Sequence, residues 1–271
     1  ADNVVDAAIA RAGMLRVDTL EQLFLAAEIL TRYQAPIGDR MTVLTNGGGV
    51  GVLAADAAAT EDVPLADLSA PLKRALDQVL PANWSHGNPV DIIGDAPAER
   101  YVDALKALGQ HPADTGTLLF IHAPTAIVPP TDIARAMIPV IRPAGQQPLP
   151  LVSAWVGGPS VAEARRLFVD AGIACYDLPE QAVMAIGMLQ RYARNRAELS
   201  EAPPAAQLHN GSTPDVARVR ALMQSVLASG RDMLTEPEAK AVCEAYHIPV
   251  VATRTVPADA DAAAAEAARI G

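Results

Sequence analysis

Aromatic residues and cysteines are scarce in this sequence of 271 residues: Phe, Trp and Tyr make up 4% of it, and there are two cysteines. Cys175 and Cys243 lie far apart and match neither a disulfide framework nor a metal-ligand spacing. We therefore expect two free thiols and no metal site. Few rings are available to stack on a flavin, which argues against a flavin-binding module.

An excess of positive charge is also lacking, and so are long apolar runs. The net charge is −10, and no basic patch of the kind that binds nucleic acid is visible. No run of 18 apolar residues exists, and the first residues have no basic segment typical of a signal peptide. We expect a cytoplasmic protein with no nucleic-acid or membrane partner. An anionic ligand would have to be held by backbone N–H groups and helix N-termini.

Complete catalytic motifs are missing as well. The sequence has no Ser/His/Asp elbow, no HExxH, no CxxC and no lysine-bearing phosphate loop. No catalytic residue is therefore assigned within the chain.

What is present is a regular alternation of strand-like and helix-like segments from Met41 onward. The strand-like segments are continuous apolar runs, which is typical of a parallel sheet covered on both faces. The alternation predicts a doubly wound α/β fold over residues 40–199. The expected strands are 41–46, 64–69, 88–93, 115–122, 148–156 and 173–178, each followed by a helix.

The flanking segments have a different character. Residues 18–33 predict a helix with one apolar stripe, formed by Leu20, Leu23, Phe24, Ala27 and Leu30. Residues 200–215 are rich in Pro, Ala, Gly and Ser and predict a linker. Beyond them we expect two helices, a strand over 249–256 and a last helix. Both chain ends are expected to lie inside larger domains.

The loops after the strands are where a ligand site is expected, because parallel strands end at one edge of the sheet. The first loop reads "TNGGGVG", in which Asn46, Gly47, Gly48 and Gly49 connect a strand to a helix. Bare backbone before a helix N-terminus favours an anion such as phosphate. The alternative is a tight turn whose glycines only allow the helix to pack on the sheet.

Two further loops carry candidate ligand-binding residues. In "SHGNPVDIIGDAP" these are Asn88 and Asp91, with structural capping as the alternative, and His86 as a possible general base or an ordinary surface histidine. In "HAPTAIVPPTD" they are Ala123 and Thr125, with a rigid capped loop as the alternative. A fourth loop, "AWVGGPS", repeats the strand-to-glycine pattern.

Five motifs in a fixed order give the sequence a family resemblance. They are "VVDAAIARAGMLRVDTLEQLFLAAEIL", "VLTNGGGVGVLAADA", "WSHGNPVDIIGDAPAERY", "EARRLFVDAGIACYDLPEQAV" and "LTEPEAKAVCEAYHIPV". Together they resemble the NDP-forming acyl-CoA synthetases, also called ADP-forming acetate–CoA ligases, which are relatives of succinyl-CoA synthetase. The resemblance is closest to the long bacterial forms, which are often fused to a GNAT acetyltransferase domain.

The resemblance implies a domain layout. Residues 1–39 resemble the C-terminal tail of a preceding CoA-ligase domain with its connector. Residues 40–199 resemble a flavodoxin-like, succinyl-CoA synthetase-type domain, and residues 200–215 a linker. Residues 216–271 resemble the start of an ATP-grasp domain.

The resemblance also implies a reaction: acid, CoA and ATP give acyl-CoA, ADP and phosphate through an acyl phosphate and a phosphohistidine. The full-length protein would use ATP or ADP, CoA and Mg, with CoA-binding and ATP-grasp domains as partners and possibly as a homo-oligomer. The phosphohistidine is expected upstream of Ala1, so this piece alone should be inactive and bind no cofactor tightly. The alternative is a non-catalytic, ligand-sensing region of a GNAT lysine acetyltransferase.

Overall fold

The computed structural model describes residues 2–33, 37–200, 213–251 and 253–270. The chain divides into two compact units, residues 1–201 and residues 202–271. Most of the linker expected at 200–215 lies outside the described residues.

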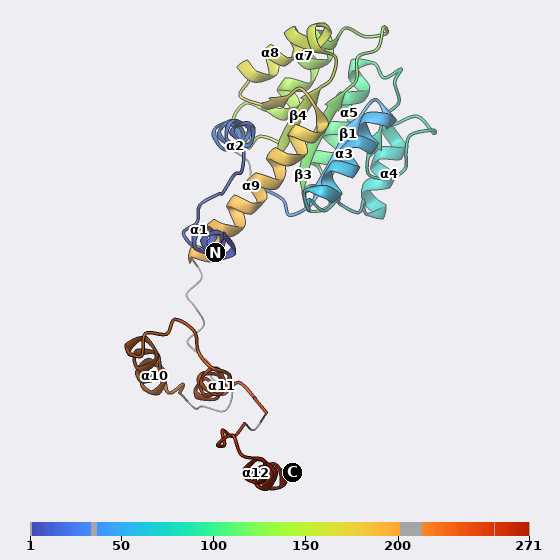
Figure 1. Cartoon of the computed structure of the whole chain (residues 1–271). Helices are drawn as coiled ribbons and strands as arrows, with labels where there is room; N and C mark the ends of the chain where they lie inside the picture. The colour runs from blue at the N-terminus through green and yellow to red at the C-terminus, as the bar shows by residue number, and fades with distance from the viewer. Residues whose placement is uncertain (1, 34–36, 201–212, 252, 271) are drawn as a thin grey trace. The chain divides into compact units, whose positions relative to one another are not determined.

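A single parallel sheet forms the centre of the first unit (Figure 1). Its strand order is β2-β1-β3-β4-β5, the order of flavodoxin-like folds, which confirms the expected fold class. Neighbouring strands are all parallel, as in the register Thr45↔Ile121 between β1 and β3. The strands are β1 Met41–Thr45, β2 Val90–Asp91, β3 Thr117–His122, β4 Leu151–Trp155 and β5 Ala174–Tyr176.

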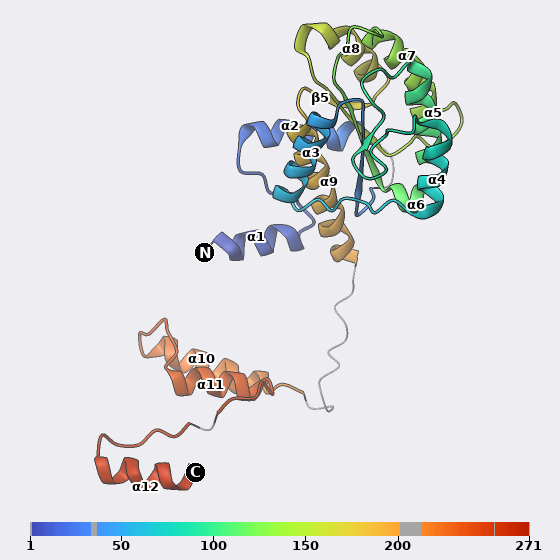
Figure 2. The ribbon, with the colours of Figure 1, turned by 90° about the vertical axis from the view of Figure 1, so that its right-hand side faces the viewer.

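Helices cover both faces of the sheet, which explains why its strands are continuous apolar runs. One face is covered by α2, α3 and α9, and the other by α4, α5, α7 and α8 (Figure 2). On the first face lie α2 Leu20–Arg32, α3 Gly48–Thr60 and α9 Pro179–Ser200, against which α1 Asp2–Arg11 packs. On the second lie α4 Ala70–Val79, α5 Ala98–Gly109, α7 Pro130–Ile141 and α8 Ala162–Asp170. The short elements α6 Pro112–Thr115 and η1 Gly158–Val161 precede β3 and α8.

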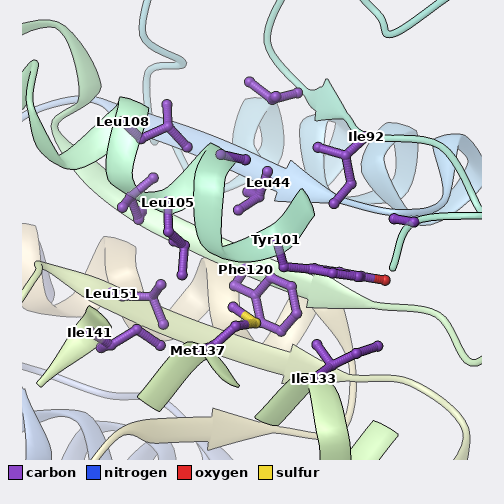
Figure 3. Close-up of a cluster of buried hydrophobic side chains, with 14 of the residues drawn as sticks. Leu44, Ile92, Tyr101, Leu105, Leu108, Phe120, Ile133, Met137, Ile141 and Leu151 are labelled. Atoms are coloured by element: carbon purple, nitrogen blue, oxygen red, sulfur yellow. The ribbon is translucent and has the colours of Figure 1, made fainter. Parts of the chain in front are cut away.

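The larger core cluster lies on the second face. Phe120 of β3 and Tyr101 of α5 meet edge to face, with ring centroids 5.9 Å apart and both side chains almost fully buried. Leu44 of β1 and Met137 of α7 complete the contact (Figure 3). The contact between these two rings packs α5 against β3.

The strand expected at 64–69 does not form. Leu65 makes only an isolated bridge with Met41. The side chain of Asn88 bonds to Val43 N, Met41 O and Ala66 O, so it occupies the edge of β1 where that strand would continue. The Asn88 side chain thus takes the place of a strand beside this part of β1, and β2 pairs with β1 further along, at Leu44 and Thr45.

The apolar stripe expected on α2 does not face the core. The buried residues are Leu25, Ala26 and Ile29, whereas Leu20 and Phe24 are 73% and 71% exposed. The helix has apolar residues around most of its circumference, so the sequence pattern alone did not fix which side packs on the sheet.

In the second unit, α10 Val216–Ala228 and α11 Glu236–Ala245 pack together, and α12 Ala260–Ile270 follows. Asp215 caps α10, and Thr235 with Glu238 forms a capping box on α11. The strand expected over 249–256 is wrong: the described residues of that segment form no strand. A strand requires a neighbour to complete its hydrogen bonds, and the described part of this unit offers none.

None of the described helices combines the length and apolar character needed to cross a bilayer.

The packing of α3 predicts opposite outcomes for two of its glycines. A Cβ at Gly51 would lie 3.1 Å from Thr45 Cγ2 and 3.2 Å from Pro89 Cβ, whereas one at Gly49 meets nothing within 4 Å. Gly51→Ala should lower the free energy of unfolding by about 1–3 kcal/mol through overpacking. Gly49→Ala should leave it unchanged or raise it by up to about 1 kcal/mol.

Denaturant unfolding followed by tryptophan fluorescence measures this difference, because both tryptophans, Trp84 and Trp155, lie in the first unit. Equal stabilities for the two variants would contradict close packing at Gly51.

Candidate functional site

The loops at the carboxyl edge of the sheet converge through direct contacts. Asn46 directly follows β1 and is 2% exposed. Its Nδ2 donates to Ala123 O at 2.8 Å, and Ala123 N donates to its Oδ1 at 2.9 Å. A Cβ at Gly47 would lie 3.2 Å from Ala123 Cβ. The loop after β1 is therefore fastened to the loop after β3, and the Asn46 amide is used for that purpose.

The other two loops join this edge. A Cβ at Gly94, after β2, would lie 3.6 Å from Asn46 O and 3.9 Å from the Thr125 methyl carbon. A Cβ at Gly157, after β4, would lie 2.7 Å from Pro124 Cγ. The structure thus brings all four candidate loops together along one edge.

The N-terminus of α3 is bare. Its N-cap, Gly47, makes no side-chain cap, and no acidic residue lies in the first turn. Thr45 Oγ1 accepts the Gly47 N–H at 3.1 Å. Gly48 and Gly49 are exposed, and their N–H groups, like all those of a first turn, have no partner within the helix. The helix dipole gives this exposed backbone partial positive charge.

Asp91, at the end of β2, brings a carboxylate to the same place. Its Oδ1 accepts the Ile93 N–H at 2.9 Å, and its Oδ2 lies 3.0 Å from the position of a Cβ on Gly48. The charge is favourable beside a helix N-terminus, although it has the same sign as a phosphate. Ile93 is held at φ +69°, an unusual conformation for a β-branched residue.

Asn88 lies away from the loop edge. Its three hydrogen bonds, to Val43 N, Met41 O and Ala66 O, use both ends of its amide on the backbone around β1. Of the two interpretations of this residue, these contacts favour the structural one.

The side chain of His86 also makes its contacts with residues that do not belong to the loop edge. Its Nδ1 lies 3.2 Å from Asp77 Oδ1, its Nε2 lies 3.0 Å from Ala82 O, and the ring packs on Trp84 at 4.7 Å. These contacts suit a surface histidine rather than a general base at the loop edge.

Two residues near this edge were not among the candidates. Arg100 of α5 donates to Ile92 O at 3.0 Å and to Asp95 at 2.6 Å, which ties down the loop after β2. His122 ends β3 and is fully buried, 4.9 Å from Trp155 between ring centroids. The sequence marked His122 only as the end of a strand, and nothing in it indicated the contacts of Arg100.

Burial in this cluster lowers the pKa of the His122 imidazole to about 4. Its Nδ1 lies 3.5 Å from Tyr101 OH, and its Nε2 and Trp155 Nε1 have no hydrogen-bond partner among the described residues. The ring is neutral and out of reach of a ligand on the surface.

The two cysteines lie in β5 and α11 and not in the four loops. Cys175 and Cys243 are both free thiols, as expected. Within the described ranges, no group of three or more His, Cys, Asp or Glu residues could hold a metal ion.

The model of the Ligase-CoA domain family matches residues 41–200 of the chain. The chain belongs to this family. The matched region contains the whole sheet, the four loops and α9.

Curated relatives of this Ligase-CoA chain are named as ADP-forming ligases. The alpha subunit of acetate–CoA ligase (ADP-forming) I from Pyrococcus furiosus is 34% identical over 200 residues, covering 74% of this chain and 43% of the relative. The 4-hydroxybutyrate–CoA ligase (ADP-forming) from Nitrosopumilus maritimus is 23% identical over 270 residues and is covered to 37%. The chain spans less than half the length of these relatives.

A solved structure supports the same family. The apo form of the dinucleotide-forming acetyl-coenzyme A synthetase 1 of Ca. Korarchaeum cryptofilum matches with a TM-score of 0.67 and 32% identity. The match covers 73% of this chain and 43% of that one. That enzyme has also been solved in complex with phosphate and ADP.

Loss of the Asn88 amide should destabilise the first unit. Asn88→Ala leaves the Val43 N–H and Ala66 O without partners and removes one of the two hydrogen bonds that Met41 O accepts, at about 1 kcal/mol for each hydrogen bond and about 3 kcal/mol in total. Asn83→Ala is the control, because this exposed side chain makes no hydrogen bond with the described residues. An Asn88→Ala variant as stable as wild type would contradict the structural role.

Stability should also depend on the protonation of His122. The unfolded chain binds this proton below about pH 6.5, whereas the folded chain resists it down to about pH 4. As the pH is lowered from about 6.5 to about 4, the free energy of unfolding should therefore fall by up to about 1.4 kcal/mol per pH unit. His122→Phe should reduce this slope, measured by denaturant unfolding at each pH, and His111→Gln should not. Identical slopes in wild type and His122→Phe would show that His122 does not cause this pH dependence.

Proposed function

We propose that this Ligase-CoA domain supplies one half of the phosphoryl-transfer site of an ADP-forming acid–CoA ligase. The observation that carries the proposal is the bare glycine N-terminus of α3 at the edge where four loops converge. The family and the names of the relatives supply the reaction class.

The reaction proposed for the full-length protein joins an acid to CoA. Acid, CoA and ATP give acyl-CoA, ADP and phosphate, through an acyl phosphate and a phosphohistidine. Phosphoryl transfer depends mainly on positioning and on stabilisation of negative charge. In a chain of net charge −10, backbone N–H groups of Gly48 and Gly49 provide that stabilisation without a basic side chain, while the Gly47 N–H is held by Thr45 Oγ1. Ala123 and Thr125, from the facing loop, border the same space.

We assign Asn46, Asn88 and Asp91 to the construction of this cradle. Asn46 fastens its two loops, Asn88 fixes the edge of β1, and Asp91 holds the turn at Ile93. The carboxylate of Asp91 repels phosphoryl oxygens, so it limits how deeply an anion sits beside Gly48.

The carrier histidine of this proposal comes from another part of the full-length protein. His122 is buried and His86 is bonded to Asp77, so neither is available at the loop edge. Sites for CoA, ATP and Mg are likewise proposed for other domains, with residues 216–271 beginning an ATP-grasp domain. Assembly into a homo-oligomer and a cytoplasmic location are part of the same proposal. The acetyltransferase alternative has no observation in its favour, since the relatives above are named as ligases.

Phosphate binding at α3 tests the proposal. In a titration with inorganic phosphate, the backbone amide signals of Gly48, Gly49 and Val50 should shift in NMR spectra of the 271-residue chain. Gly49→Asp places a carboxylate over the first turn and should abolish these shifts, while remaining folded because an acidic residue suits this position.

Thr60→Ala, at the far end of α3, is the matched control and should keep the phosphate-dependent shifts. Absence of the shifts in the wild-type chain, or their persistence in Gly49→Asp, would show that α3 does not hold the phosphoryl group.

A further inference from the structure

A cavity lies at the amino-terminal edge of the sheet, opposite the loop edge. It has a volume of about 670 Å³, which is within the range of small-molecule sites. Three segments line it: residues 37–40 before β1, residues 62–65 after α3, and the second half of α9. The proposed phosphoryl-transfer site uses none of these residues.

The walls of the cavity are aliphatic. They are formed by Ile37, Pro64, Leu65, Ala193 and Ala197. No aromatic residue is among the described residues that line it, so a planar base or flavin has no ring to stack on. An aliphatic body is the best match for these walls.

Charged side chains of both signs surround the cavity. Asp39, Asp62 and Arg194 form no ion pair with any described residue, and Arg40 only approaches the fully exposed Asp67 at 3.6 Å. The two positive and two negative groups cancel in net charge. A ligand that carries both an anionic and a cationic group complements all of them.

Gln190 adds a buried polar group. It is 7% exposed, and its Nε2 donates to Gly38 O at 2.9 Å. Its Oε1 accepts no hydrogen bond from the described residues and remains accessible to solvent. A donor on a ligand in the cavity would satisfy this oxygen.

We propose that this cavity binds a small aliphatic zwitterion, namely an aliphatic amino acid or dipeptide. Its carboxylate lies toward Arg40 and Arg194. Its ammonium group lies toward Asp39, Asp62 and the Gln190 carbonyl oxygen, and its side chains contact Pro64 and Leu65.

Isothermal titration calorimetry with leucyl-leucine tests the proposal on the 271-residue chain. Hexanoate and hexylamine are the matched probes, since each keeps an aliphatic body and one of the two charges. Leucyl-leucine should bind with a dissociation constant below about 1 mM, and each single-charge probe should bind at least about tenfold more weakly.

Two variants test the charges separately. Arg194→Gln and Asp62→Asn should each weaken leucyl-leucine binding about twofold to fivefold, which is the scale expected for one exposed charge contact. Asp62 lies at φ +55°, a conformation that asparagine also accepts, so this variant should fold. Arg74→Gln, a change of an exposed arginine on α4, is the control and should not change the affinity.

Three results would overturn the proposal. One is no heat of binding from leucyl-leucine at about 10 mM, a concentration at which even a weak site would be filled. Another is hexanoate or hexylamine binding as tightly as the dipeptide. The third is unchanged affinity in both Arg194→Gln and Asp62→Asn while tryptophan fluorescence shows both variants folded.

Discussion

The reciprocal pair of hydrogen bonds between the Asn46 amide and the Ala123 backbone is the interaction on which the loop edge depends. It joins the residues that directly follow two adjacent parallel strands, β1 and β3, in the loops that lead to α3 and α7. With this pair in place, Gly47 comes so close to Ala123 that a larger residue would force a shift. The bare first turn of α3 is therefore held at a fixed position, which is what backbone recognition of an anion requires.

The acidity of the chain explains why the proposed phosphoryl site is made of backbone. A basic cluster would bind phosphate in many orientations, whereas N–H groups at a helix terminus point in one direction. Asp91 beside Gly48 adds a negative charge that favours the helix terminus and opposes deep anion binding. At the other edge of the sheet, charges of both signs surround an aliphatic cavity, and three of the four form no ion pair with a described residue. The two edges of one sheet thus present two different kinds of recognition surface.

Much of the fold could be predicted because its signals are local. Continuous apolar runs identified the five strands that form, and glycine-rich loops identified the edge where they end. The strand expected at 64–69 does not extend beyond its bridge with Met41 because Asn88 Oδ1 takes the Val43 N–H, and Asn88 lies 22 residues from Ala66 in sequence. For the site, the sequence located the loops correctly but did not separate ligand contacts from scaffold. The contacts of Arg100 and the free oxygen of Gln190 carried no sequence signal, since both depend on segments brought together only by folding.

By itself, the sequence determined the parallel α/β architecture, the order of its elements and the loops that gather at one edge. Hydrophobic runs and glycine positions are properties of short segments, so they can be recognised before the chain folds. Only the tertiary structure decided which side of α2 is buried, that His122 is enclosed and uncharged, and that Asn46 and Asn88 serve the backbone. Those outcomes depend on which distant groups compete for the same hydrogen bonds and the same buried volume.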